Sequence, residues 1–315
     1  METDFVCWLR ERIPDHPLLL LGLGDDAAIL QWRSRSDCVV TTDLLTDQVH
    51  FDVDTTPLAK IGHKSLAVNL SDLAAMASQP VGAVISLALP RQRGLQIAQQ
   101  LYEGILPLAQ RWSVALAGGD TNCWSGPLAI SVTAIGHVTE HGALRRCGVE
   151  IGDEIIVTGE LGGSILGKHL DFTPRIDEAL RLNELFDLHA AMDISDGLTL
   201  DLSRMLAESG CGAELDLDAI PISAAAHKLA GTTDIRQTPL QHALSDGEDF
   251  ELILTMSSGE AKRLLAQPPV DTRLTRIGRC IEQPGLFAVD AAGRHTSLQP
   301  RGFTHGGNDE IPNDQ

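Results

Sequence analysis

Residues 69–76 read Asn69-Leu70-Ser71-Asp72-Leu73-Ala74-Ala75-Met76 and lie within residues 57–77, where apolar side chains recur at helical spacing. The Ser-Gln-Pro sequence at 78–80 predicts the end of this helix. Ser65, Asn69 and Asp72 are spaced i, i+4, i+7, so they share one face. This narrow polar stripe on an apolar helix has two interpretations. Either Asp72 points to water, or it binds a metal ion, because a buried carboxylate needs a cation.

Other carboxylates occur where apolar runs end, often beside glycine, at Asp25, Asp26, Asp43, Asp120, Asp193 and Asp196. Backbone can approach a ligand closely at such places. Aspartates that converge on one pocket repel each other unless divalent cations neutralise them. Carboxylates suit Mg²⁺, which bridges to phosphate oxygens, and phosphoryl transfer depends mostly on positioning and charge stabilisation. The acidic set therefore favours a Mg²⁺-dependent phosphoryl-transfer site. The spacing leaves open whether the side chains meet.

Charge and length narrow the class of protein. The chain has 315 residues, which favours two domains. Its 43 acidic and 24 basic residues give a formal charge of −19. We therefore expect neither nucleic acid nor an anionic membrane as a partner. An acidic protein that holds a phosphate substrate needs cations to do so.

Cysteine usage and the N-terminus indicate a cytoplasmic protein. The six cysteines are scattered and form no Cys-x-x-Cys pair, so neither a zinc site nor a disulfide framework is indicated. The first residues, Met-Glu-Thr-Asp, carry early acids and do not resemble a signal peptide. No apolar run approaches the roughly 20 residues of a membrane span.

Alternating strand and helix patterns predict an α/β (α+β) protein of two domains. We expect a β-rich N-terminal domain with flanking helices over 1–145, a C-terminal α+β domain over 146–304, and a disordered tail over 305–315. In the first domain the predicted strands are 38–42, 81–89, 113–117 and 128–138, and the predicted helices are 1–16, 57–77 and 94–111. In the second, the predicted strands are 155–158, 213–217, 250–255, 274–280 and 286–289, and the predicted helices are 177–188, 198–209, 222–230 and 258–267.

A Walker-like stretch needs separate consideration. Residues 162–169 nearly match the Gly-x4-Gly-Lys-Ser/Thr phosphate loop and follow a predicted strand. His169, however, replaces the hydroxyl that contacts Mg²⁺ in such loops, and Asp171 and Pro174 follow where a helix is needed. We therefore favour a connection that binds no phosphate over a nucleotide loop.

Several blocks, taken in order, resemble the thiamine-monophosphate kinase family. This family belongs to the superfamily of aminoimidazole ribonucleotide synthetase and selenophosphate synthetase. A single block would be weak evidence for the resemblance, but together the blocks extend from about residue 22 to 303. They are 22–26 (Gly-Leu-Gly-Asp-Asp), 41–43 (Thr-Thr-Asp), 50–51 (His-Phe), 66–76, 118–121 (Gly-Gly-Asp-Thr), 144–148 (Leu-Arg-Arg-Cys-Gly), 193–197 (Asp-Ile-Ser-Asp-Gly) and 245–252 (Ser-Asp-Gly-Glu-Asp-Phe-Glu-Leu).

This resemblance implies the two-domain superfamily fold and a homodimer paired through the N-terminal domains, with nucleotide near the interface. It also implies transfer of the γ-phosphoryl group of ATP, with several Mg²⁺ ions, to thiamine phosphate, which yields thiamine diphosphate. The nucleophile would be a substrate phosphate oxygen that is already ionised at neutral pH. No strong general base is then required, and no catalytic dyad is evident.

The resemblance also assigns site residues by position. The implied metal ligands are Asp26, Thr41, Thr42, Asp43, Asp72, Asp120, Asp193 and Asp196. The implied nucleotide contacts are Gly119, Asp120, Arg146 and Ser195, and the implied thiamine contacts are His50, Glu248 and Phe303. Several have an ordinary alternative when taken alone. Arg146 could be a solvated arginine, His50 a surface histidine, Glu248 a loop acid and Phe303 a packing residue.

The departures from the family pattern lie mostly on the acceptor side. The region 159–175 is shorter than usual, Phe172 replaces a proline, and Asp246 replaces a glycine. Two alternatives therefore stay open: a related ATP-dependent enzyme with another acceptor, and a non-catalytic nucleotide-binding relative. The retained Asp72, Asp120 and Asp193 count against the second, because unused clustered carboxylates destabilise the folded state.

Overall fold

The computed structural model describes residues 5, 8–9, 11–21, 29–32, 36–231, 237–289 and 293–304. The predicted Gly-Asp-Asp block at 22–26, which includes the candidate metal ligand Asp26, lies outside these residues. So do the tail at 305–315 and part of the predicted N-terminal helix.

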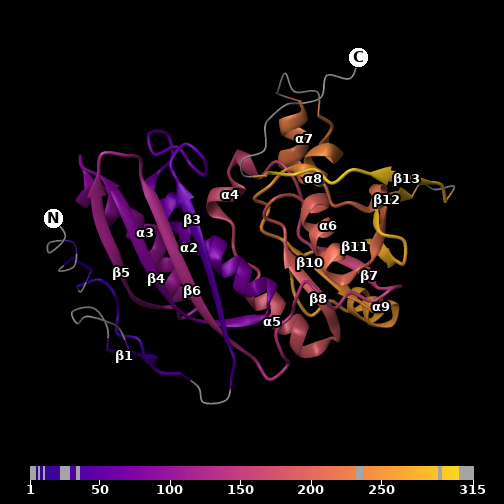
Figure 1. Ribbon diagram of the computed structural model, residues 1–315, viewed down its shortest axis with the longest axis horizontal. Coiled ribbons are helices and arrows are strands. Elements are labelled where there is room, and N and C mark those ends of the chain that lie inside the picture. Colours follow the sequence, from indigo (N-terminus) through magenta and orange to yellow (C-terminus); the bar gives the residue numbers. More distant parts are fainter. Residues whose placement is uncertain are drawn as a thin grey trace.

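The N-terminal domain is a four-stranded sheet with two long helices on one face (Figure 1). The strand order is β3-β6-β4-β5, and only the β4–β5 pair is parallel. The strands are β3 (Cys38–Thr46), β4 (Ser78–Pro90), β5 (Ala115–Trp124) and β6 (Ala129–Val138), with a separate small pair β1 (Leu19–Leu21) and β2 (Ile29–Leu30). The helices are α2 (Leu58–Ala75) and α3 (Gly94–Arg111).

Helix α2 is the central element of the molecule. Gly62 on α2 faces Leu101 of α3, where an added Cβ would meet the Leu101 carbonyl oxygen at 1.9 Å. Gly104 on α3 faces Ala59 of α2 in the same way. These two glycines let the helix backbones touch. The rest of α2 packs against β3, β4 and β6, so it is buried on most sides.

The C-terminal domain is a seven-stranded mixed sheet in the order β13-β12-β9-β11-β7-β10-β8. Only the β12–β9 pair is parallel. The strands are β7 (Glu154–Thr158), β8 (Leu188–Asp193), β9 (Gly212–Asp216), β10 (Leu252–Met256), β11 (Leu274–Ile281), β12 (Gly285–Val289) and β13 (His295–Leu298). The helices are α4 (Lys168–Asp171), α5 (Ile176–Leu185), α6 (Leu198–Ser209), α7 (Ala224–Ala230), α8 (Pro239–Ser245) and α9 (Ser258–Ala266), with 3₁₀ turns at Ser164–Leu166 and Leu217–Ala219.

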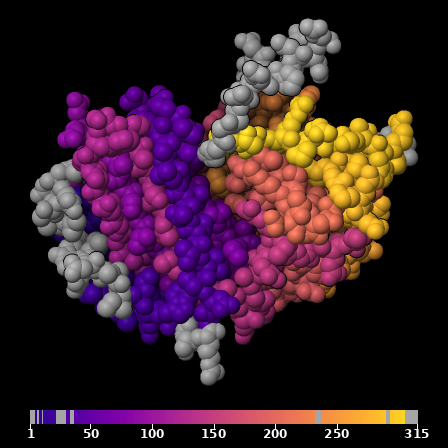
Figure 2. Space-filling model, in the orientation of Figure 1, coloured from indigo at the N-terminus to yellow at the C-terminus, as the bar shows by residue number. Residues whose placement is uncertain are grey.

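The two domains share a core at their junction. Helix α2 also packs against α4, α5 and β8 of the C-terminal domain. One cluster of buried apolar side chains continues from α2 and the first sheet into α5, β8 and β10. In the space-filling view the two halves meet along a broad boundary (Figure 2). The predicted two-domain α/β fold is therefore confirmed. The boundary at 145/146 stays a prediction, and it falls between the last strand of one sheet and the first of the other.

The structure corrects the sequence prediction at two strands. We expected strands at 38–42 and 113–117 that end just before Asp43 and Asp120. Both continue, so these aspartates lie inside β3 and β5. Strand β3 continues because Leu45 is the next buried position of its alternating pattern, and β5 continues because its pairing with β4 runs on to Trp124. Strands β8 and β13 and helix α8 were not predicted. Among the described helices, none is long and apolar enough to cross a membrane.

Candidate functional site

A cavity of about 840 Å³ lies where the two domains meet, and both contribute to its wall. Seven residues that the sequence singled out line it: Thr42, Asp43, His50, Ser195, Asp196, Glu248 and Phe303. They come from β3, the loop after β3, the loop after β8, the loop after α8 and the C-terminal segment. The predicted metal and thiamine residues are therefore brought together from positions more than 250 residues apart in sequence.

A second cavity of about 440 Å³ lies next to β3 and α2, and Thr41, Asp72, Arg146 and Asp193 line it. The Thr41 hydroxyl donates a hydrogen bond to the Asp72 carboxylate. The hydroxyl of Ser71, one residue before Asp72, donates to Asp193 Oδ2 at 2.7 Å. Helix α2 thus carries Asp72 of the N-terminal domain and, through Ser71, binds Asp193 of the C-terminal domain.

These carboxylates crowd one another, which answers the question that the spacing left open. Burial and then the charge of Asp72 raise the pKa of Asp43 to about 7. Burial raises the pKa of Asp72, although the Thr41 hydrogen bond and the charge of Arg146 act against it. Asp193 is 3% exposed, and burial followed by the charge of Asp72 places its pKa well above the usual value. Buried carboxylates that raise one another's pKa values are typical of functional sites, and a cation beside them would stabilise their charged forms.

The loop after β8 is fixed by a residue that the sequence analysis missed. Asp201, in the first turn of α6, is fully buried and accepts hydrogen bonds from the backbone N–H groups of 195, 196 and 197 at 2.8–3.1 Å. Arg204 binds both Asp201 and the neighbouring Asp196. An acid early in a helix that follows Ser-Asp-Gly is a recognisable anchor for helix N-terminal N–H groups. The carboxylate of Asp196 therefore reaches the cavity with its charge partly balanced.

Lys64, on helix α2, is the second residue that the sequence analysis missed. It is 1% exposed, and its ammonium donates to Glu248 Oε1 at 2.5 Å and to the His50 carbonyl oxygen at 2.7 Å. Burial lowers its pKa, against the opposing effect of Glu248. A lysine inside an apolar helix is seldom buried without an anionic partner, and that was the available signal. This contact joins α2 to the acceptor side of the cavity.

Glu248 adopts a backbone conformation that disfavours most side chains. Its φ is 64°, in the left-handed region. Its N–H donates to the Ser195 carbonyl oxygen at 2.7 Å, and its carboxylate binds Lys64. Strain of this kind persists where surrounding contacts over-determine it, commonly at functional sites. Glu248 is therefore an ion-paired and partly buried side chain in the described structure, and its contact with the acceptor stays a prediction.

Gly119 and Asp120 lie apart from the other predicted site residues in a single chain. Both are exposed on β5, which forms the opposite edge of the sheet from β3. Three strand spacings, about 14 Å in total, separate the two edges. Local packing explains why residue 119 is a glycine, because an added Cβ would meet the Ile85 carbonyl oxygen at 1.7 Å. The expectation that Asp120 joins the acidic set is therefore not met within one chain.

The Walker-like stretch has internal partners for the groups that would bind phosphate. Lys168 donates to Glu251 Oε1 at 2.8 Å and to the Glu160 carbonyl oxygen. The N–H groups of Gly162 and Gly163 donate to the carboxylates of Asp249 and Asp246. Because these N–H groups already bind carboxylates, they are not free to bind a phosphate. This agrees with the interpretation of the stretch as a connection that binds no phosphate.

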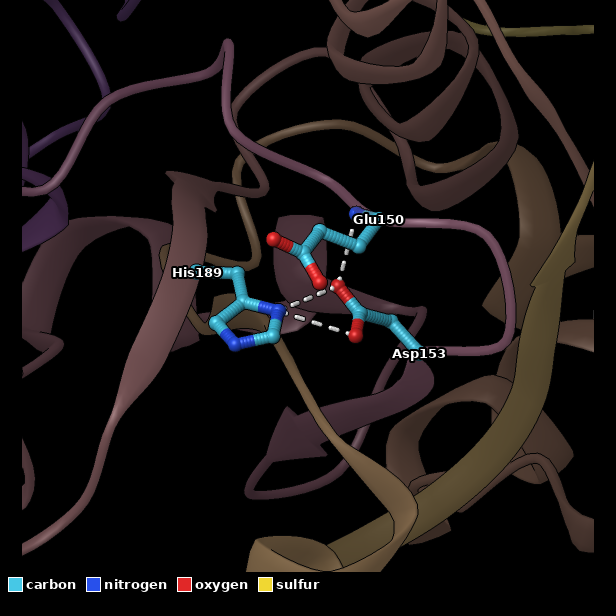
Figure 3. Close-up of side chains that lie close together, drawn as sticks. All are labelled: Glu150, Asp153 and His189. Atoms are coloured by element: carbon cyan, nitrogen blue, oxygen red, sulfur yellow. Dashed lines mark hydrogen bonds and ion pairs between the residues drawn. The ribbon is translucent and has the colours of Figure 1, made fainter.

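Another cluster of titratable groups lies outside the cavity (Figure 3). Both carboxylate oxygens of Asp153 are 2.9 Å from His189 Nδ1, and one also accepts from the Glu150 N–H at 2.8 Å. These hydrogen bonds give the buried Asp153 carboxylate its partners and close the turn before β7. We assign this cluster a structural role.

Comparisons with known proteins agree with this geometry. Residues 24–138 match the AIR synthase related protein N-terminal domain, and residues 126–290 match the corresponding C-terminal domain. The chain is therefore an AIR synthase-related protein. Thiamine-monophosphate kinase of Rhodopirellula baltica is 44% identical over 98% of each chain. With that identity and coverage, the chain belongs to the thiamine-monophosphate kinase family.

Solved structures of the family support the same assignment. The crystal structure of thiamine-monophosphate kinase from Stenotrophomonas maltophilia K279a is 38% identical, has a TM-score of 0.76, and the match covers 91% of this chain and 94% of that one. AaThiL, solved in complex with AMPPCP and TMP, is 26% identical with a TM-score of 0.76 over 96% of both chains.

Proposed function

We propose that the protein transfers the γ-phosphoryl group of ATP to thiamine phosphate and so forms thiamine diphosphate. The observation that carries this proposal is the junction cavity, where Asp43 of β3 and Asp196 of the loop after β8 lie on the same wall as the Lys64–Glu248 pair. Family membership supports the same reaction. Because the reaction uses ATP, we place the protein in the cytoplasm.

The donor set fits Mg²⁺. Burial raises the pKa of Asp43, Asp72 and Asp193, and the charge of Asp72 raises the pKa of Asp43 and Asp193 further. Divalent cations with oxygen ligands relieve both effects. We propose as ligands Asp43, Asp72, Asp193 and Asp196, together with Thr41 and Thr42. Asp26 lies outside the described residues and stays a candidate ligand from the sequence alone. Bound Mg²⁺ neutralises phosphate charge and polarises the transferred group. Arg146 and Ser195 are proposed nucleotide contacts.

The chain's own residues would position the two substrates. The acceptor phosphate is ionised at neutral pH, so the nucleophile needs no strong general base. His50, Glu248 and Phe303 line the part of the cavity that we assign to thiamine phosphate, and Lys64 holds Glu248 and the His50 carbonyl in place. Catalysis would come from alignment and charge stabilisation rather than from a proton relay.

An acceptor panel separates this function from its alternatives. ADP release should depend on thiamine phosphate and stay at background with thiamine, with a purine-precursor ribonucleotide, or without an acceptor. Release that depends on another phosphorylated acceptor would favour a related enzyme of the superfamily. No release with any acceptor, together with retained ATP binding, would favour the non-catalytic relative.

We also propose a homodimer, in which the second copy brings Asp120 to the acidic set. The face of the N-terminal sheet opposite α2 and α3 exposes Val40 by 60%, Leu44 by 59% and Val84 by 36%, an unusual density of apolar side chains for a free surface. Light scattering at micromolar protein should give twice the 33.8 kDa chain mass. A mass that stays at that of one chain would contradict this.

Glu248→Gln should raise the KM for thiamine phosphate about tenfold while the KM for ATP changes less than about twofold. The substitution keeps the side-chain shape but removes the charge that faces the acceptor, and hydrogen bonds to charged groups contribute about 1.5–3 kcal/mol. Steady-state kinetics with each substrate varied in turn measure both constants. The exposed Glu282→Gln serves as the control. An unchanged KM for thiamine phosphate would indicate that the acceptor is another molecule.

A further inference from the structure

We propose that His242 and Asp246 form a recognition element of the acceptor cavity, in which His242 Nε2 accepts a hydrogen bond from the amino group of an aminopyrimidine ring. This inference rests on the proposed function, because thiamine phosphate carries such a ring. It adds two residues that neither the motifs nor the family blocks assigned to substrate.

The two residues lie on the wall of the same cavity as the predicted site. His242 is in α8 and Asp246 directly follows that helix, and both line the 840 Å³ cavity. Asp246 is two residues before Glu248, which is held by Lys64. A continuous series of contacts therefore leads from α2, beside the carboxylates, through Glu248 to His242.

The hydrogen bonds of Asp246 determine which ring nitrogen of His242 carries the hydrogen. Both carboxylate oxygens are 3.0 Å from His242 Nδ1, and Oδ2 also accepts from the Gly163 N–H at 2.8 Å. A carboxylate accepts and does not donate, so the hydrogen of the first bond is on Nδ1. In the neutral ring Nε2 is then an acceptor.

This acceptor has no partner in the part of the chain that the structure describes. His242 is 3% exposed, and its Nε2 is buried without a hydrogen bond. A buried polar atom left unpaired is destabilising, so such an atom beside a cavity points to a ligand that completes it. In the neutral ring the Asp246 contact makes Nε2 an acceptor, so the ligand group that completes it is a hydrogen-bond donor.

The chemistry of the proposed acceptor supplies such a donor. In thiamine phosphate the phosphate and the aminopyrimidine are attached on opposite sides of the thiazolium ring. If the reacting phosphate lies beside Asp43 and Asp196, the pyrimidine occupies another part of the same cavity, and we place it against the wall that His242 lines. Phe303 lines this cavity too and offers a ring surface for an aromatic heterocycle. The 4′-amino group of the pyrimidine is the donor that Nε2 requires.

Asp246→Asn tests the polarity of this element. The Asn carboxamide must keep its oxygen towards the Gly163 N–H, so its NH₂ group faces His242 Nδ1 and donates to it. The ring hydrogen then moves to Nε2, which becomes a donor. Oxythiamine phosphate, in which an oxo group replaces the 4′-amino group, distinguishes the two states because it presents an acceptor at that position.

We expect the parent protein to prefer thiamine phosphate over oxythiamine phosphate by at least about tenfold in kcat/KM, and Asp246→Asn to lower this ratio by about tenfold or more. The KM for ATP should stay within about twofold in both. His242→Phe, which keeps a ring but has no nitrogen, should bring the ratio close to one, and it provides the test if Asp246→Asn does not fold. A ratio that stays at the parent value in a folded variant would overturn the inference.

A control variant and the activity of the parent protein make the outcome specific to His242 and Asp246. Asp153→Asn alters the other buried histidine–aspartate pair, with His189 (Figure 3), and should leave the substrate ratio unchanged. If the parent does not turn over thiamine phosphate at all, the proposed function fails. If the parent turns it over and neither variant shifts the ratio, only the role of His242 and Asp246 fails.

Discussion

Asp72→Asn is expected to lower kcat at least about a hundredfold, because it removes a charged group from the position where phosphate charge must be stabilised, an effect of about 3 kcal/mol or more. The charge of Asp72 raises the pKa of both Asp43 and Asp193, so Asp72 is the neighbour that these two carboxylates share. The substitution keeps the side-chain shape and the Thr41 contact. Turnover with saturating ATP, Mg²⁺ and thiamine phosphate measures it.

The same variant should behave differently without metal. The pKa of Asp43 is raised from 3.8 to about 7, so the folded chain holds that proton more tightly than the unfolded chain. The stability it contributes is therefore present at low pH and lost as pH rises towards 7. In EDTA, Asp72→Asn should lose less thermal stability than the parent between pH 5 and pH 8, because one repelling charge is gone.

Exposed Asp218→Asn is the control for both measurements. If Asp72→Asn turns over at the parent rate, the metal assignment fails and the acidic set has a structural role only. If its melting temperature in EDTA falls with pH as steeply as that of the parent, the carboxylates do not repel each other as the geometry implies.

Lys64→Met is expected to lower kcat/KM for thiamine phosphate by about a hundredfold. The ammonium of Lys64 positions Glu248 and the His50 carbonyl at once, and loss of positioning by about 1 Å costs a factor on the order of 10². Methionine fills a similar volume without the charge. Kinetics with thiamine phosphate varied at fixed ATP measure the effect.

Lys60→Met provides a matched control one turn earlier on α2. Lys60 pairs with Asp171 at 2.6 Å, but both side chains are about half exposed, and such surface pairs contribute little. Its kcat/KM should stay within about twofold of the parent. Equal losses of kcat/KM in the two variants would show that the effect comes from a general disturbance of helix α2 and not from loss of the Lys64–Glu248 contact.

The helices and the inner strands could be predicted from sequence because their patterns are local. Helix α3 spans the predicted residues 94–111, and α2 differs from its prediction by one or two residues at each end. The apolar residues of both recur at helical spacing. Strand β8 could not be predicted in the same way, because a short apolar run directly after a helix is equally consistent with either element.

The candidate site could be predicted where a motif carries it and not where a distant partner decides it. Thr41–Asp43, Asp72 and Asp193–Asp196 stand in recognisable blocks. Lys64 reaches Glu248 across 184 residues of sequence, so only the folded chain reveals that contact. The position of Asp120 shows the converse limit: a motif residue does not join the site within one chain when two strands, β6 and β4, lie between its strand and β3.

Phosphorus NMR of the reaction mixture tests the central claim most directly. The full chain is incubated with ATP, Mg²⁺ and thiamine phosphate, and the spectra follow each phosphate. We predict that the thiamine phosphate signal is replaced by the two coupled signals of thiamine diphosphate, in step with the conversion of ATP to ADP. Unchanged thiamine phosphate, whether or not ATP is consumed, would contradict it.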